Sequence, residues 1–214
     1  LFEDCRFVGY NDNMSIQGFG NVAASILSDF RMRRCVVTDA FTTVGHSQGL
    51  FMSLVDTVLI EECFFDHNGW NENLVGAEAT IFNRNLYLSH DVTNVTTKRN
   101  IVVRSSSEGL QQRGGGLCEE NLFIKNGGEG VLFGQFQSSW PSEAVSGTVR
   151  NNVVLDATDI AGSPRGVGIQ FQHASGVECY GNIIAHLRSS SGNMFAISVS
   201  SQNTDINIHD NIIY

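Results

Sequence analysis

A short unit recurs through the whole chain: one small polar residue, Cys or Asn, followed by two or three β-forming residues. The units begin at Cys5, Cys35, Cys63, Asn100, Asn121, Asn152, Asn182 and Asn211, so successive intervals are 30, 28, 37, 21, 31, 30 and 29 residues. Helical repeats have a fixed period and do not tolerate such unequal spacing. A solenoid of short strands does, because extra residues leave as loops between strands of constant register.

Two further strand-like segments can be aligned inside each repeat. One series reads MSIQG, GLFMS, LYLSH, GLQQR, GVLFG, GIQFQ and ISVSS; the other, which precedes the Cys or Asn, includes TVLIEE, NVTTKR and GVECYG. Apolar residues at alternate positions would point inward from each strand. We therefore predict an all-β fold, a single-stranded right-handed parallel β-helix with three strands per coil and about seven coils. Residues 1–214 would form one domain, and because both ends fall inside repeats we expect a fragment without end caps.

The recurring Cys or Asn predicts how the coils are held together. Asn side chains at one position of successive coils lie about 4.8 Å apart and can hydrogen-bond along the axis as a ladder. Cys5, Cys35 and Cys63 take this position in the first three coils, where we expect a column of small buried thiols rather than a metal site. Cys118 and Cys179 lie two coils apart, a separation of about 10 Å, which is beyond the reach of a disulfide.

Charge and hydropathy limit the possible partners. The formal net charge of −9 argues against a broad basic face for nucleic acid or an anionic membrane. No apolar run approaches the roughly 18 residues of a membrane span. An acidic polysaccharide remains a possible partner, because a bound cation or a local basic pocket can reverse the sign where it matters.

The segment from Lys98 to Asn126, KRNIVVRSSSEGLQQRGGGLCEENLFIKN, places Arg113 near the end of a strand, before a small-residue turn and a further ladder Asn. With these residues and its Asn-rich turns, the chain resembles the pectate lyase-like superfamily, and within it polysaccharide lyases of the alginate lyase and chondroitinase B type. The resemblance implies an active site on the column of GLFMS and GLQQR strands, with Arg113 as a catalytic residue. It places the family's lysine base one coil earlier on this column, where this chain has His90.

Counting ten residues back from each ladder position predicts an outward row of Ser53, His90 and Gln172, which Arg113 joins when its shorter turn is allowed for. We expect His90 and Arg113 to be exposed nearest neighbours, so that the guanidinium keeps the imidazole neutral and able to accept a proton. Alternatively, both are ordinary solvated residues of the sheet. The glycines 114–116 are expected to leave this flank open to a sugar chain.

The longest loop, residues 66–85, would overhang the same face. Trp70 is expected either to stack on a sugar ring or to cover the outer surface of the helix. His67 reads as a turn residue, and Trp140, in a second insertion, as a further sugar platform or a loop anchor. Asp66, Glu72 and Glu78 could bind a cation such as Ca²⁺. Further substrate contacts are expected from Gln111, Gln170, Gln172, His46 and His173.

Two functions from different classes follow from these expectations. The first is a polysaccharide lyase that cleaves a uronic-acid-containing glycan by β-elimination; secretion or a periplasmic location follows only from that substrate class. The second is a non-catalytic glycan-binding, adhesin or tailspike-like β-helix module, since the fold hosts both. Glycoside hydrolysis has little support, because the column shows no pair of adjacent aspartates.

Overall fold

The protein, seen in a computed structural model that describes residues 1–19, 26–136, 144–157, 165–190 and 194–214, is a stack of three parallel sheets. Sheet A contains β1 (Phe2–Glu3), β4 (Leu27–Arg33), β7 (Val55–Glu61), β10 (Val92–Lys98), β13 (Gly116–Glu119), β16 (Val145–Arg150), β19 (Ala174–Tyr180) and β22 (Thr204–His209). Sheet B contains β2 (Arg6–Val8), β5 (Val36–Thr38), β8 (Phe64–Asp66), β11 (Ile101–Val103), β14 (Leu122–Ile124), β17 (Val153–Leu155), β20 (Ile183–Ala185) and β23 (Ile212–Ile213). Sheet C contains β3 (Met14–Gln17), β6 (Gln48–Ser53), β9 (Arg84–Leu88), β12 (Leu110–Gln112), β15 (Glu129–Phe133), β18 (Val167–Gln172) and β21 (Phe195–Ser200).

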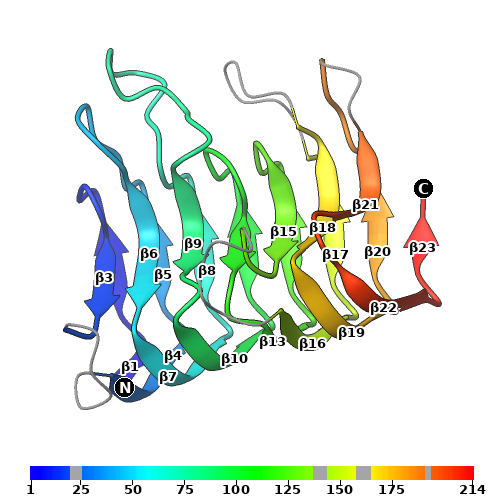
Figure 1. Cartoon of the computed structure of the whole chain (residues 1–214). Helices are drawn as coiled ribbons and strands as arrows, with labels where there is room; N and C mark the ends of the chain where they lie inside the picture. The colour runs from blue at the N-terminus through cyan, green and yellow to red at the C-terminus, as the bar shows by residue number, and fades with distance from the viewer. Residues whose placement is uncertain (20–25, 137–143, 158–164, 191–193) are drawn as a thin grey trace.

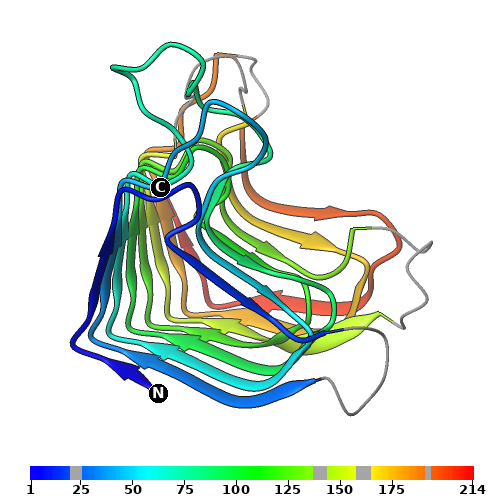
Figure 2. The same cartoon turned by 90° about the vertical axis from the view of Figure 1, so that its left-hand side faces the viewer.

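Each strand pairs with the strands one coil before and one coil after it, so the chain passes through sheets A, B and C in turn (Figure 1). Figure 2 looks along the stack, where the coils superimpose and the longer loops rise from the corner between sheets B and C. The predicted three-sided parallel β-helix is therefore confirmed, together with the assignment of all three strand columns.

One continuous apolar core fills the space between the three sheets. Each sheet contributes the inward residues of its strands, including Ile60 from sheet A, Phe65 and Phe123 from sheet B, and Phe133 and Phe171 from sheet C. The same inward position recurs from coil to coil because the strands are in parallel register. Stacked aromatic side chains such as Phe133 and Phe171, whose ring centroids lie 6.0 Å apart, are a direct result.

The predicted Asn ladder is present at the start of sheet B. The Nδ2 atoms of Asn100, Asn121 and Asn152 donate to the Oδ1 of the next ladder residue at 3.0 Å, and Asn182 donates to Asn211 at 2.9 Å. Each Oδ1 from Asn121 to Asn211 also accepts the backbone N–H of the ladder residue one coil before it. The ladder therefore satisfies backbone and side-chain groups that burial would otherwise leave unpaired.

Cys35 and Cys63 form the predicted column of buried thiols, whereas Cys5, in the first coil, is only half-buried. Cys35 and Cys63 are buried, and the backbone N–H of Cys35 lies 3.4 Å from Cys63 Sγ, so the thiols continue the ladder column. Val149 lies between Cys118 and Cys179 in sheet A, and all five cysteines are free. Burial raises the pKa of Cys118 and of Cys179 to about 12, so both are neutral thiols at physiological pH.

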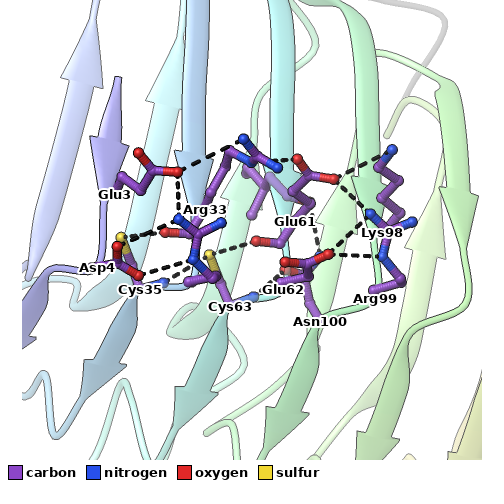
Figure 3. Close-up of polar contacts among 12 residues, drawn as sticks. Glu3, Asp4, Arg33, Cys35, Glu61, Glu62, Cys63, Lys98, Arg99 and Asn100 are labelled. Carbon is purple, nitrogen blue, oxygen red and sulfur yellow. Dashed lines mark hydrogen bonds and ion pairs between the residues drawn. The ribbon is translucent and has the colours of Figure 1, made fainter.

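Two columns of alternating charge run beside the ladder at the corner between sheets A and B, a feature that our sequence analysis missed. Paired strand ends carry the first column, and the left-handed turn residues that follow them carry the second (Figure 3). The strand-end column is Glu3, Arg33, Glu61, Lys98, Glu119 and Arg150, and the turn column is Asp4, Arg34, Glu62, Arg99 and Glu120. A slip by one coil would place like charges side by side, so the columns favour the observed pairing.

Glu61 is paired with three cations of these columns. Its side chain is 5% exposed and its carboxylate lies 2.6 Å from Arg33 Nε, 2.8 Å from Arg99 Nη2 and 3.3 Å from Lys98 Nζ (Figure 3). Burial alone would raise the pKa of Glu61, but the three cations outweigh it and hold the pKa below its usual value. The carboxylate is thus kept ionised where it joins three coils.

We expect Asn121→Leu and Asn152→Leu each to lower the free energy of unfolding by about 1–3 kcal/mol, because ladder partners stay buried without a hydrogen bond. Thermal or urea unfolding measures the loss. Asn207→Leu, at an exposed position of β22, is the control and should change stability by less than about 0.5 kcal/mol. Equal stability of the ladder variants and the control would contradict the buried ladder.

We expect Glu61→Gln to destabilise the protein at pH 7 by about 2 kcal/mol, less than for a fully buried ion pair because its partners are partly solvated. Because the pKa of Glu61 is lowered in the folded state, its contribution is present above the unfolded pKa and is lost as the pH falls through the folded pKa. Urea unfolding at pH 7 and at low pH should show the difference shrinking. Glu62→Gln, at the neighbouring and more exposed turn position, should have a smaller effect.

Candidate functional site

The outer face of sheet C carries the polar residues that the repeat places in rows across coils. Leu50, Leu86 and Leu110 point into the core, and the next residue of each strand, Phe51, Tyr87 or Gln111, lies on the outer side. The loops that rise from the corner between sheets B and C stand at the beginning of these strands (Figure 2). Sheet C is therefore the face beside which loop residues and strand residues gather.

Arg113 lies on this face, but the expectation that it is exposed is wrong. Its side chain is 5% exposed, and its Nη1 donates to the carbonyl oxygen of Gly134 at 3.2 Å and to Gln172 Oε1 at 3.0 Å. Its guanidinium carbon lies 5.5 Å from the ring centre of Phe136. Burial lowers the pKa of Arg113 to about 10. Residues of later coils cover it, which the short loop of its own coil did not indicate.

The three glycines after Arg113 do not open its flank. A Cβ on Gly114 would lie 1.6 Å from the carbonyl oxygen of Val92, and one on Gly116 would lie 2.3 Å from that of Val95. A Cβ on Gly115 would lie 2.4 Å from the carbonyl oxygen of Ser146. These glycines let the backbones of adjacent coils approach each other, so they serve packing rather than access of a ligand.

His90 lies outside the row that contains Arg113, because three residues separate Leu88 from Val92, whereas two residues separate their paired positions in the coil before. Met52 pairs with Leu88 and Val55 with Val92, so Ser89 takes the position expected for His90. His90 is half-buried, and its Nδ1 lies 3.2 Å from Ser89 Oγ.

Of the predicted substrate-binding residues, the structure brings Gln170 and Gln172 together with Arg113. Gln172 Nε2 donates to Gln170 Oε1 at 3.1 Å, and Gln170 Nε2 donates to Ser200 Oγ at 3.2 Å. Gln111 is buried beneath this face, and His173 lies in the left-handed turn after β18. The polar chain from Arg113 through Gln172 and Gln170 thus crosses several coils.

The loop between β8 and β9 is attached to the turns of sheet B through Trp70 and His67. Trp70 Nε1 donates to the carbonyl oxygen of Arg104 at 3.0 Å, and its ring packs edge-on against His67 with centroids 4.8 Å apart. His67 has a left-handed backbone, as expected of a turn residue, and its two ring nitrogens lie 2.8 Å from Asp39 and from Glu72. Trp70 therefore ties its loop to the turn after β11, a role that differs from both of those expected for it; Trp140 lies outside the described residues.

The residues proposed to bind a cation have other partners. Asp66 forms an ion pair with Arg104, its Oδ2 lying 2.6 Å from Nη2. Glu72 contacts His67, and Glu78 Oε1 accepts the backbone N–H of Gly76 at 3.0 Å. Within the described ranges, no group of three or more His, Cys, Asp or Glu is placed to hold a metal ion.

Two hollows open on the outer face of sheet C. The first, of about 490 Å³, lies over β3, β6 and β9; the second, of about 480 Å³, lies over β15, β18 and β21. His46 lines the first hollow and packs edge-on against Phe82 with ring centroids 5.4 Å apart. The main residues of the first hollow are Asp12, His46, Gln48, Phe51, Arg84 and Tyr87, and those of the second are Glu129, Arg165, Gln170, Gln172, Phe195 and Ser198.

Two buried carboxyl groups, which our sequence analysis missed, belong to Glu108 and Glu129, and Glu129 lines the second hollow. Glu108, two residues before β12, and Glu129, the first residue of β15, occupy the same place in adjacent coils, and each is 2% exposed. Glu108 Oε2 lies 2.8 Å from Arg84 Nε and accepts the Ser107 hydroxyl at 2.7 Å. Glu129 Oε1 accepts a longer contact of 3.4 Å from Arg165 Nη1.

The two carboxyl groups differ in their affinity for a proton. Burial and the charge of Glu108 raise the pKa of Glu129 to about 7, more than Arg165 lowers it. Burial would also raise the pKa of Glu108, but Arg84 and the Ser107 hydroxyl hold it below its usual value. The proton of the pair therefore resides on Glu129, in agreement with the closer contacts of Glu108. The sequence signal is Glu-Gly at residues 108–109 and 129–130, 21 residues apart like Asn100 and Asn121.

Comparison with protein-family models, with curated proteins and with solved structures gives no match for this chain. The three stacked parallel sheets define the class of this protein, a three-sided parallel β-helix. Within the described part of the chain, no helix is long and apolar enough to cross a membrane.

We expect Glu129→Gln to raise the melting temperature at pH 8 by roughly 5 °C and to change it little at pH 4.5. The raised pKa means that the folded protein binds this proton more tightly than the unfolded chain, so wild-type stability falls as the pH rises from about 4.5 to about 7. Calorimetric scans across this range test the expectation. Glu178→Gln, at an exposed position, is the control; the same pH response in wild type and Glu129→Gln would contradict it.

Proposed function

We propose that this protein binds an acidic polysaccharide along the outer face of sheet C and cleaves it by β-elimination. The observation that carries the proposal is the placement of three arginines, Arg84, Arg113 and Arg165, in and between the two hollows of a protein whose net charge is −9. A guanidinium presents a planar pair of donors that matches a uronate carboxylate.

The proposed reaction breaks the C5–H and C4–O bonds of a uronate and forms a C4=C5 double bond. A guanidinium that pairs with the uronate carboxylate makes the C5 proton more acidic and stabilises the charge that develops as the proton leaves. We assign charge stabilisation to Arg113 and proton abstraction to His90, in the turn after β9. The electron pair of the C4–O bond leaves with the departing sugar oxygen, which takes up a proton. A cation such as Ca²⁺ could assist by neutralising the carboxylate.

A non-catalytic glycan-binding module is the second candidate, and the burial of Arg113 favours it. The Arg113 guanidinium is held by Gly134 and Gln172, as expected of a clamp between coils. In that case the two hollows would bind sugar residues without any chemistry at Arg113 or His90.

We expect the wild-type protein to produce an ultraviolet-absorbing unsaturated end on at least one of alginate, pectate and chondroitin. Arg113→Lys should lower turnover by roughly two orders of magnitude, because lysine cannot present the planar pair of donors that a guanidinium does. His90→Ala should lower turnover to a similar extent, because it removes the proposed base. The melting temperature should fall for Arg113→Lys but change little for His90→Ala, since only Arg113 is fully buried.

His186→Ala, at an exposed turn of sheet B, is the control and should retain full turnover. Glycan binding without any unsaturated product, unchanged in Arg113→Lys and His90→Ala, would reject the lyase and support the binding module.

A further inference from the structure

We propose that the hollow over β15, β18 and β21 is a proton-linked subsite for a carboxylated sugar, in which the protonated Glu129 donates a hydrogen bond to the sugar carboxylate while Arg165 pairs with it. This inference rests on the proposed function for the polymer that carries the sugar. It adds a recognition site distinct from the proposed catalytic residues Arg113 and His90.

The hollow has the features of a built site. Glu129 lines the hollow although only 2% of its surface is exposed to solvent. Its Oε1 is bonded to Arg165, whereas its Oε2 is buried and has no hydrogen-bond partner in the described part of the chain. A buried polar atom without a partner is costly, so a ligand that supplies one gains free energy of binding.

The state of Glu129 follows from the charged groups that face it. Glu108 precedes β12 on one side and is ionised, because it contacts Arg84 and the Ser107 hydroxyl. Arg165, which precedes β18 on the other side, contacts Glu129 at 3.4 Å and is 41% exposed. Arg113, directly after β12, would attract Glu129 if Glu129 were ionised, but its guanidinium donates to Gly134 and Gln172. Burial and repulsion from Glu108 thus raise the pKa of Glu129 to about 7, so the protonated form predominates below that pH.

The other lining residues fit a sugar. Phe195 is half-exposed, and an aromatic face of this kind stacks on the apolar face of a pyranose ring. Gln170, Gln172 and Ser198 supply donors and acceptors for hydroxyl groups. A carboxylate fits the remaining pair, one cation and one acid O–H, better than a neutral group, because it can accept from both at once.

Ionisation of Glu129 would remove the donor and place a second negative charge beside the ligand. The affinity for a carboxylated sugar should therefore be constant below about pH 6.5 and fall towards tenfold per pH unit above about pH 7.5. A neutral sugar of the same ring size should bind weakly and without this dependence.

Titration calorimetry with trisaccharides of galacturonate, mannuronate, guluronate and glucuronate, from about pH 5.5 to 8.5, tests the inference. Wild type should bind at least one with the stated loss of affinity. Glu129→Gln should keep the low-pH affinity and lose the pH dependence, because its amide donates at every pH. Arg165→Gln should weaken binding at least about tenfold at every pH. Arg31→Gln, on sheet A, is the matched control and should behave as wild type.

No binding of any of the four trisaccharides, a wild-type affinity independent of pH, or the same pH dependence in Glu129→Gln would each overturn the inference. The readout separates this outcome from failure of the lyase proposal. Proton-linked binding without unsaturated product rejects only the lyase, whereas unsaturated product without proton-linked binding rejects only the subsite.

Discussion

Register between coils is the constraint on which the rest of this structure depends. A parallel solenoid has no local interaction that tells one coil which neighbour to pair with, since every coil offers similar strand edges. Here the amide ladder fixes the height of the coils from Asn100 to Asn211. The side-chain oxygen of each Asn from Asn121 onward accepts both the side-chain amide and the backbone N–H of the ladder residue one coil before it. The alternating charges beside it favour one order of coils over another, since a slip would bring carboxylates together.

The same register creates the site on sheet C. The coil that runs from Asn100 to Asn121 is the shortest of those between ladder positions, so residues 21 apart are stacked there without an intervening loop. Glu108 and Glu129 consequently lie at the same place in adjacent coils, about 4.8 Å apart in the backbone. Two carboxyl groups buried at this spacing cannot both ionise easily. Glu108 keeps the negative charge because it has the closer contacts with a cation and a hydroxyl group. The environment thus gives two identical side chains different protonation states.

Sequence reasoning reached the fold and the ladder because both depend on residues that recur at matched positions. The predicted position of His90 in the row with Arg113 was wrong. Counting ten residues back from a ladder residue does not reveal that the turn in this coil contains one additional residue. The predicted exposure of Arg113 was wrong for another reason. The groups that bury this side chain, among them Gln172, come from coils 21 to 59 residues later in the chain, and no local pattern announces them. The charge columns were readable in the motifs EDC, RRC, EEC, KRN and EEN, which alternate in sign immediately before each ladder position.

The alternating columns also explain how a protein of net charge −9 can offer a cation to an acidic ligand. Arginines of the A–B corner lie against carboxylates, as Arg99 does against Glu61 and Glu62, so their charge is compensated within the protein. Arg84 on sheet C is likewise compensated by the ionised Glu108. Arg165 differs, because the group it contacts, Glu129, is neutral below about pH 7. Among these arginines it is the one whose positive charge is not cancelled by its own contact. Local charge pairing, rather than the net charge, therefore sets where an anion can bind on this surface.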